Sequence, residues 1–184
     1  RNRIYAAAQG ALFSVDRSDL TLDYWNRSTG LNGNAVKHIV FDNNTQQLVI
    51  AYEDGRIDLM SENGTIVQMP DLYMKSSSVS VAINCLTAGS NCVYAGTDFG
   101  IIAINPRKAE VTDTYYIEDE AASVDIEQIV EIGDTLYAFS HDSMRMYKAC
   151  LHDNLVDYSF WQRVKTQDKV QQAMAWKNEL YILQ

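Results

Sequence analysis

The sequence predicts an all-β repeat fold, and three observations lead to this prediction. Five short apolar segments recur in steps of 43 to 45 residues, with equivalent positions at Tyr5, Val49, Tyr94, Tyr137 and Tyr181. Six positions after each of the first four equivalent residues comes a small residue: Ala11, Gly55, Gly100 and Ser143. A second apolar segment begins after each of these small residues. Two further apolar segments fit into each complete step. Four strands in a repeat of this length are the signature of a β-propeller blade.

The individual strands follow from turn residues and from the repeat. The small residue suits a tight turn between antiparallel strands, because its backbone reaches dihedral angles that larger residues avoid. Turn-forming residues such as Asp42-Asn43-Asn44 separate the other strands. We therefore expect blades of four antiparallel strands. They belong to one propeller domain or propeller fragment, 1–184, with repeats near residues 4–26, 36–69, 79–117, 124–164 and 170–184.

Two segments conflict with this assignment when they are taken alone. Apolar residues in 126–132 and in 170–176 recur at helical spacing. Both segments nevertheless stand where the repeat requires the innermost strand of a blade, and we expect strands there.

The number of blades is about four, and we expect them to be part of a larger propeller. The first repeat has no segment for an innermost strand, and the fifth contains only two segments. In the alternative, a closed ring of four blades, 170–176 would complete the first blade. Because an unpaired strand edge recruits another strand, we expect the first blade to be completed by the C-terminal strands or by a second copy. Homo-oligomers could therefore form through open blade edges.

The balance of charges narrows the class of partner. The chain has 184 residues, with 24 acidic and 15 basic side chains and a formal net charge of −9. Because phosphate binding needs clustered Lys and Arg, this balance argues against nucleic acid. The longest apolar run, 101–104, is far too short to span a bilayer. An acidic cluster could dock a basic partner, although a solvated link between blades is the expectation: Glu118, Asp119, Glu120, Asp125 and Glu127.

No group of residues indicates catalysis or metal binding. The three histidines, His38, His141 and His152, have no second ligand type at metal-binding spacing. The sequence contains neither a nucleophile elbow nor a phosphate-binding loop. We therefore expect a protein that is not an enzyme and uses no cofactor and no metal.

Candidate binding residues lie in the turns between the second and third strands. Radial repetition would place these turns on one rim around the channel mouth, and loops on a rigid scaffold often carry binding residues. The candidates are Glu53, Asp54, Asp98, Phe99, His141 and Asp142. Four carboxylates facing one mouth would favour a cationic or hydroxyl-rich partner over an anionic one. In the alternative, these residues only solvate their turns.

The predicted strand register keeps the cysteines apart. It places Cys85 opposite Gly96 and Cys92 opposite Gly89, so the two cysteines lie four residues apart along the ladder. That separation is about 13 Å at the rise of a strand, whereas a disulfide needs α-carbons within about 7 Å. We predict that Cys85, Cys92 and Cys150 all remain thiols.

Several stretches resemble a known family. They are 29–36 followed by 50–59, then 99–104 and 110–117, together with 5–7 and 10–13. Over Ile4 to Trp161 they resemble the N-terminal propeller of PorZ-type proteins of Bacteroidota. The sequence departs from the family at Gly10-Ala11, where two glycines are usual, and at Glu118, where a glycine is common.

The resemblance implies a non-enzymatic binding or scaffold propeller in the type IX secretion machinery. It implies export to the periplasm or the outer-membrane cell surface, with other secretion-system proteins or a cell-surface glycolipid as partners. The stretches 30–36 and 39–42 are also similar to periplasmic ligand-sensing propellers of hybrid two-component regulators, which is the alternative function. Those sensors carry Trp in the second strand of most repeats, where this chain has Tyr or Val. We therefore favour the secretion function.

Overall fold

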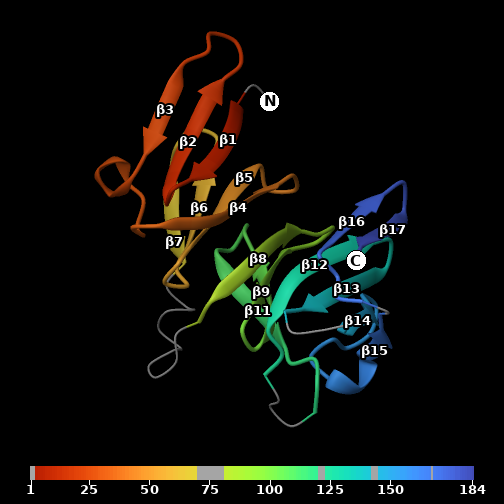
Figure 1. Cartoon of the computed structure of the whole chain (residues 1–184). Helices are drawn as coiled ribbons and strands as arrows, with labels where there is room; N and C mark the ends of the chain where they lie inside the picture. The colour runs from red at the N-terminus through yellow and green to blue at the C-terminus, as the bar shows by residue number, and fades with distance from the viewer. Residues whose placement is uncertain (1–2, 70–80, 120–122, 142–144, 167) are drawn as a thin grey trace. The chain divides into compact units, whose positions relative to one another are not determined.

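The computed structural model describes residues 3–69, 81–119, 123–141, 145–166 and 168–184. The described strands form five antiparallel sheets that follow one another along the chain (Figure 1). The chain divides into two compact units, residues 1–82 with 106–110 and residues 83–105 with 111–184. In the described part of the chain, no helix is both long and apolar enough to cross a membrane.

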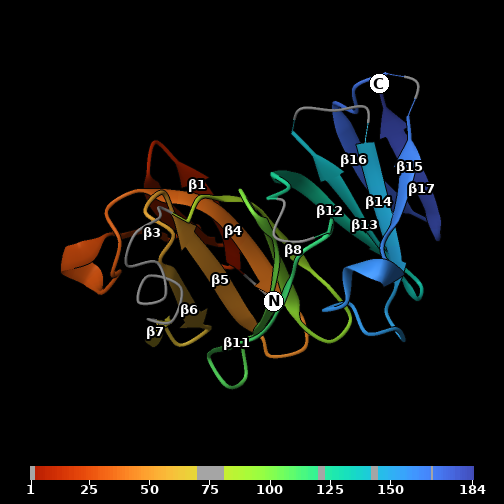
Figure 2. The same cartoon turned by 90° about the horizontal axis from the view of Figure 1, so that it is seen from below.

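The first unit contains two sheets, and in each one the strands pair in chain order (Figure 2). The first sheet consists of β1 (Arg3–Ala8), β2 (Ala11–Asp16) and β3 (Leu22–Trp25). A 3₁₀ turn, η1 (Arg27–Thr29), leads to the second sheet. Asn26 caps the beginning of this turn, and Gly30 ends it. The second sheet consists of β4 (Val36–Asp42), β5 (Gln47–Tyr52), β6 (Ile57–Ser61) and β7 (Ile66–Met69).

The second unit contains three sheets. The first consists of β8 (Ile83–Ala88), β9 (Val93–Thr97), β10 (Gly100–Asn105) and β11 (Glu110–Tyr115). The next consists of β12 (Ile126–Ile132), β13 (Thr135–Ser140), β14 (Arg145–Cys150) and β15 (Gln162–Lys165), with η2 (Tyr158–Phe160) before β15. The last is a hairpin of β16 (Gln172–Trp176) and β17 (Glu179–Leu183).

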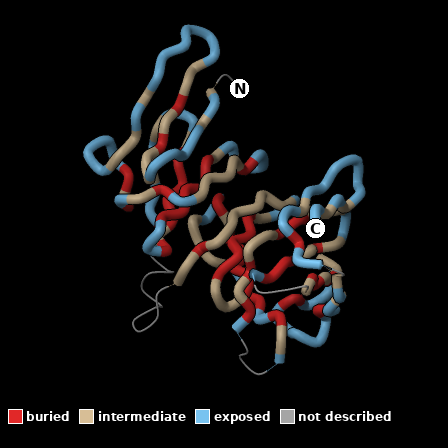
Figure 3. Tube along the Cα trace, in the orientation of Figure 1, coloured by how far each residue is buried: buried red, intermediate tan, exposed pale blue. Residues whose placement is uncertain are grey.

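Each unit is held by apolar contacts between adjacent sheets. In the first unit, Leu12 packs with Val36, Ile50 and Met60, which joins β1–β3 to β4–β7. In the second unit, a larger cluster joins the sheets β8–β11 and β12–β15, and a smaller one joins β12–β15 to the hairpin. The buried positions, red in Figure 3, run along the middle strands such as β5 and β9, which are buried over nearly their whole length. Blade-on-blade packing is therefore the source of the core.

The predicted fold class is confirmed. Val49, Tyr94 and Tyr137 all lie on the second strand of a four-stranded antiparallel sheet, on β5, β9 and β13. Repeats that are equivalent in sequence are therefore equivalent in strand position. The assignment of 1–184 to a single propeller domain stays a prediction.

A β-bulge explains why the segment 126–132 has helical spacing although it is a strand. The pairing of β12 with β13 shifts by one residue between Ile126 and Gln128. An extra residue in a strand moves the side chains that follow it to the opposite face. Ile126 and Ile129 therefore enter the same cluster although they stand three residues apart. The same shift occurs in β4 after Val36 and in β8 after Ile83.

The turn of the first blade differs from the prediction by one residue. Ala11 was expected to be the small turn residue, but it is the first residue of β2 and pairs with Ala8. The left-handed backbone falls on Gln9 and Gly10, with φ of 51° and 76°. Positive φ at both central residues is the pattern of a two-residue hairpin turn that follows the strand twist. Ser143, the corresponding residue of the fourth repeat, lies outside the described residues.

The sheets at the two ends of the chain lie in different units. β1 pairs with β2 in a sheet of three strands in the first unit, and β16 pairs with β17 in a sheet of two strands in the second. One face of the hairpin packs on β12–β15. Completion of the first blade by the C-terminal strands or by a second copy stays a prediction, and so does the alternative of a closed four-blade ring.

The predicted register around the cysteines is confirmed. Cys85 pairs with Gly96, and the Gly89 amide donates to the Cys92 carbonyl at 2.9 Å across a two-residue turn. Gly96 is needed opposite Cys85, because a Cβ there would lie 2.7 Å from the Cys85 sulfur. Burial raises the pKa of the Cys85 thiol to about 11.

We expect the unfolded, unreduced protein to contain three thiols. In the folded protein, Cys85 should alkylate slowly at pH 8, because the thiolate is the reactive form and little of it exists below the raised pKa. Its rate should rise about tenfold per pH unit from pH 8 to pH 10. Mass spectrometry of alkylated peptides measures both quantities. A count of one thiol, or a Cys85 rate that does not change with pH, would contradict this account.

Candidate functional site

The rim turn of the second blade, residues 52–56 between β5 and β6, contains two of the predicted binding residues. Glu53 and Asp54 are both exposed. Asp54 is not a free carboxylate, because it accepts from the Arg56 guanidinium at 2.7 and 2.9 Å. Gly55 allows the turn to close, since its φ is 80° and a Cβ would lie 2.4 Å from the Val81 carbonyl oxygen. Of this pair, Glu53 is the carboxylate available to a partner.

A buried carboxylate follows this turn, at the second residue of β6. Asp58, on β6, has no exposed surface. It accepts hydrogen bonds from the Asn32 amide at 2.9 Å, from Asn32 Nδ2 at 3.0 Å and from the Tyr52 hydroxyl at 2.5 Å. Burying a carboxylate is very unfavourable unless hydrogen bonds replace its water. These three donors therefore explain why an acidic residue is tolerated among Ile57, Leu59 and other buried neighbours.

The same residues hold the loop between the first and second blades. Arg56 Nη1 donates to the Asn32 carbonyl at 2.7 Å, and the Glu53 amide donates to the Ala35 carbonyl at 3.0 Å. Gly10, in the rim turn of the first blade, accepts from the Val36 amide at 2.8 Å. The rim turns of both blades in this unit are thus tied to one loop, residues 31–36. We call Asn32, Gly33, Tyr52, Arg56 and Asp58 the loop clamp.

Tyr52 and Gly33 form the apolar side of the loop clamp. A Cβ on Gly33 would lie 2.1 Å from Cδ1 of Tyr52, so the loop backbone rests directly on the ring. Burial and the neighbouring Asp58 raise the pKa of Tyr52 above its ordinary range. The hydroxyl therefore stays a proton donor to Asp58 at neutral and alkaline pH. The clamp fixes a loop, and its groups are engaged with one another, which suits recognition better than chemistry.

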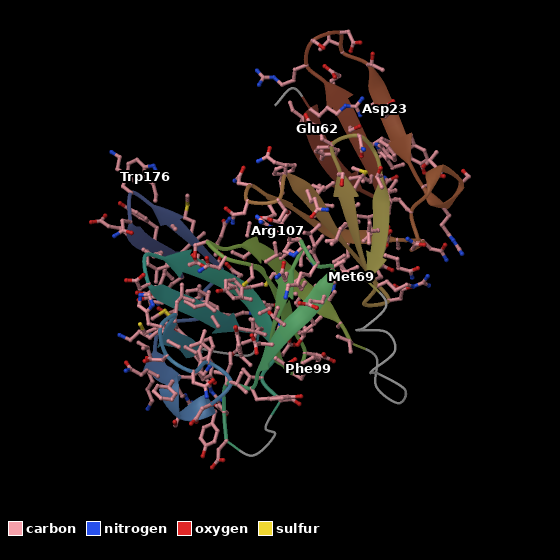
Figure 4. All side chains as sticks on the ribbon, turned by 180° about the vertical axis from the view of Figure 1, so that it is seen from behind. Asp23, Glu62, Met69, Phe99, Arg107 and Trp176 are labelled. Atoms are coloured by element: carbon pink, nitrogen blue, oxygen red, sulfur yellow. The ribbon has the colours of Figure 1, made fainter. Side chains whose placement is uncertain are left out.

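The rim turn of the third blade presents an aromatic ring and a half-buried carboxylate. Asp98 and Phe99 form the two-residue turn between β9 and β10, where Thr97 pairs with Gly100. Gly100 has a φ of 147°, and a Cβ there would lie 2.3 Å from the Tyr115 carbonyl oxygen. The Phe99 ring, labelled in Figure 4, lies 6.1 Å from that of Tyr116. Asp98 Oδ1 is buried and has no hydrogen-bond partner among the described residues.

The rim of the fourth blade is described only in part. His141 is exposed, and its Nδ1 contacts the carboxylate of Glu127. Its amide donates to the Asp125 carbonyl at 3.0 Å, and Asn84 Nδ2 donates to Asp125 Oδ1 at 2.6 Å, which links β8 to this blade. Asp142 lies outside the described residues. His141 is therefore a surface group paired with a carboxylate.

The acidic cluster between the third and fourth blades is partly satisfied within the protein. Glu118 accepts from the Tyr147 hydroxyl at 2.6 Å and lies 3.7 and 3.8 Å from the guanidinium groups of Arg145 and Arg163. Together with the partners of Asp125 and Glu127, these contacts reduce the charge that a basic partner would meet. The expectation of a solvated link is corrected for these three residues, because each has a partner within the protein. The partners lie on β14 and β15 for Glu118, on β8 for Asp125 and in the turn after β13 for Glu127.

Each rim candidate that the structure describes lies in a turn between a second and a third strand, as predicted from the repeat. In the first unit, the loop 31–36 joins the two rim turns through backbone hydrogen bonds and is itself held by the loop clamp, an arrangement that sequence reasoning missed. One signal could have revealed it, because Asp58 is an acidic residue inside the apolar run 57–60. Whether the rim binds a partner stays a prediction.

A family comparison decides the assignment. The family described as the N-terminal β-propeller domain of PorZ, of the type IX secretion system, matches residues 4–162. The chain belongs to the PorZ N-terminal propeller family. The resemblance seen in the sequence is confirmed, and two of the stretches that carry it, 29–36 and 50–59, contain all five clamp residues. A comparison of this PorZ-family chain with curated proteins found no match.

Solved structures agree with a PorZ-type propeller. The chain is similar to PorZ of Porphyromonas gingivalis, described as an essential surface component of the type-IX secretion system, with a TM-score of 0.85 and 22% identity. That match covers 99% of this chain and 24% of the other, so this chain spans about a quarter of that PorZ. At this identity the likeness shows the fold alone.

Two other similar structures come from different functional classes. The extracellular domain of the one-component system BT4673 from B. thetaiotaomicron has a TM-score of 0.74 and 17% identity, covering 98% of this chain and 24% of that one. The WD40 domain of Neurospora crassa Pan2 has a TM-score of 0.66 and 10% identity, covering 95% of this chain and 52% of that one. Both likenesses show the propeller fold.

Replacing Gly33 with alanine should destabilise the PorZ-type propeller by about 2 kcal/mol or more, because the new methyl group overlaps the Tyr52 ring. The neighbouring Asn34→Ala is the control, since Asn34 is exposed, and it should cost within about 0.5 kcal/mol. Urea unfolding followed by tryptophan fluorescence measures both. Equal stability of the two variants would show that the loop does not rest on Tyr52.

Replacing Asp58 with alanine should cost about 3 kcal/mol, because the buried donors of Asn32 and Tyr52 lose their acceptor. Asp54→Ala is the control, because it removes an exposed ion pair and should cost within about 1 kcal/mol. The double variant Asp58→Ala with Tyr52→Phe should lose less than the sum of its single changes, since it removes both partners of one hydrogen bond. Additive losses in urea unfolding would contradict the clamp.

Proposed function

We propose that this chain is a non-enzymatic binding propeller of the type IX secretion machinery at the bacterial cell surface. The observation that carries the proposal is the family match over residues 4–162. A PorZ structure with the same fold is described as an essential surface component of that system. Export of this chain to the cell surface, and its partners there, are part of the proposal.

The rim turns of each unit are the proposed binding positions. Of the described candidates, Glu53 is exposed, Asp54 is balanced by Arg56, Asp98 is half buried, and His141 is paired with a carboxylate. These turns therefore offer mixed hydrogen-bonding groups and the Phe99 ring, not four free negative charges. Within each unit, such turns suit a polar partner of low charge. We propose other secretion-system proteins, or the sugar hydroxyls of a cell-surface glycolipid, as the bound groups.

The loop clamp supports a binding role for the rim. It holds the loop 31–36 on the second blade through a buried carboxylate and a close glycine contact. Backbone hydrogen bonds tie the rim turns of both blades of this unit to the same loop. A rigid loop loses little conformational freedom when a partner binds, which favours affinity. We also propose that the rim has no catalytic role, because the polar groups beside it form hydrogen bonds that hold the backbone of the loop.

Deleting the gene that encodes this chain from its bacterium should leave the cargo proteins of the type IX secretion system inside the cell. Complementation with the rim variant, Glu53→Gln, Asp54→Asn, Asp98→Asn and Asp142→Asn, should restore surface cargo several-fold less well than the wild-type gene. The matched control makes four equal changes at exposed carboxylates outside the rim turns: Glu62→Gln, Asp19→Asn, Asp134→Asn and Asp168→Asn. Surface cargo is measured by fractionation and immunoblotting.

Two outcomes would contradict parts of this proposal. Unchanged surface cargo after gene removal, with altered transcription of neighbouring genes, would favour the ligand-sensing alternative. Normal cargo attachment in the rim variant, at equal protein level, would leave the secretion role intact but place the binding surface elsewhere.

A further inference from the structure

Each unit of this protein has a cavity between two neighbouring blades. In the first unit a cavity of about 330 Å³ lies between the sheet β1–β3 and the turn that joins β6 to β7. In the second unit a cavity of about 400 Å³ lies between β9–β11 and the link from β14 to β15. The aromatic repeat position of the preceding blade, Tyr5 or Tyr94, lines each cavity. Both cavities are therefore built on the same plan, and each lies within one unit.

The cavity of the first unit contains a guanidinium group of its own. Arg3 Nη1 lies 2.7 Å from Asp23 Oδ2, which is labelled in Figure 4, and donates to Ser14 Oγ at 3.1 Å. Trp25 Nε1 donates to the same serine oxygen at 3.1 Å, so the guanidinium lies beside the edge of the indole. A guanidinium interacts favourably both with a carboxylate and with an aromatic ring. This cavity thus shows which group its side chains accommodate.

The cavity of the second unit repeats the carboxylate and the aromatic rings. Asp113 precedes Tyr115 by two residues on β11, and both line the cavity. Asp23 and Trp25 have the same spacing on β3. Tyr94 and Tyr115 are only 4% and 8% exposed, so their rings form a buried floor. Burial and the nearby Asp113 carboxylate raise the pKa of Tyr115 to about 12, which places this carboxylate close to the tyrosine hydroxyl.

The second unit has shorter side chains where the first unit has Arg3 and its partner Ser14. By the repeat, Cys92 stands in the position of Arg3, and Ala103 stands in the position of Ser14. Asp153, in the link before β15, adds a second carboxylate to the lining. Among the described residues, no Lys, Arg or His lines this cavity. It therefore keeps the groups that hold a guanidinium in the first unit and lacks the guanidinium itself.

We propose that the cavity of the second unit binds the guanidinium of an arginine side chain from a partner protein. The group would take the place that Arg3 has in the first unit, paired with Asp113 and resting on the rings of Tyr94 and Tyr115. Arginine suits these groups better than lysine, because its planar head can pair with a carboxylate through two N–H groups while it stacks on a ring. The formal net charge of −9 also favours the approach of a basic partner.

The test titrates the 184-residue chain with N-acetyl-arginine amide and follows amide signals by NMR. The probe should bind with a dissociation constant of about 1 mM, as expected of a ligand of its size. It should shift the side-chain amide signals of Asn91 and Asn154, which line the cavity. N-acetyl-citrulline amide has the same shape without the charge, and N-acetyl-lysine amide has the charge without the planar head. Both should bind at least about fivefold more weakly.

A double variant tests the two carboxylates. Asp113→Asn with Asp153→Asn should weaken binding of the arginine probe at least about tenfold. The control, Asp134→Asn with Asp168→Asn, removes the same charge at exposed positions outside the cavity and should bind as the wild-type chain does. All four side chains are exposed, so the melting temperature should change little.

Three results would overturn the proposal: no binding of the arginine probe at about 10 mM, equal binding of the citrulline probe, or unchanged affinity in the Asp113 and Asp153 variant. Free L-arginine should bind no more tightly than the capped probe, because its own carboxylate is repelled by the two aspartates. Tighter binding of the free amino acid would overturn the assignment to a partner protein.

Discussion

The structure depends on one constraint, that the middle sheets of this propeller bury apolar side chains on both of their faces. A sheet with one solvated face alternates apolar and polar residues, whereas β5 and β9 are buried at almost every position. Each blade therefore needs a neighbour on either side. Clusters that join adjacent sheets, and not clusters within one sheet, make up the core of both units.

Hydrogen bonds between blades, and between a blade and the loop before it, accompany this packing. Thr87 Oγ1 donates to the Ile129 carbonyl at 2.8 Å, and Gln128 exchanges two hydrogen bonds with the backbone next to and within β16. The loop clamp is the fullest example, because Asp58 is buried completely and all its described partners come from β5 or the loop before β4. Apolar packing brings the sheets together, and these bonds set where a loop or an inner strand lies against its neighbour.

The loop clamp also gives the family motif a physical meaning. The stretches 29–36 and 50–59 are separate in the sequence, yet they meet at Asp58 and at the contact of Gly33 with Tyr52. Their residue types are those that a buried carboxylate and a close backbone approach require. These two stretches thus build the support of the rim turn of the second blade.

The sequence by itself determined the blades, because strand patterning and turn residues are local and recur at an even step. That step placed Val49, Tyr94 and Tyr137 correctly and outweighed the helical spacing of 126–132. Only the tertiary structure decided which acidic groups are available to a partner. Asp54, Glu118 and Glu127 have cationic or histidine partners, and Asp58 is bound by a residue 26 positions away. Apart from Asp54 with Arg56, which lie in one turn, such pairings depend on how distant segments are brought together in space, and a pattern along the chain carries no record of that geometry.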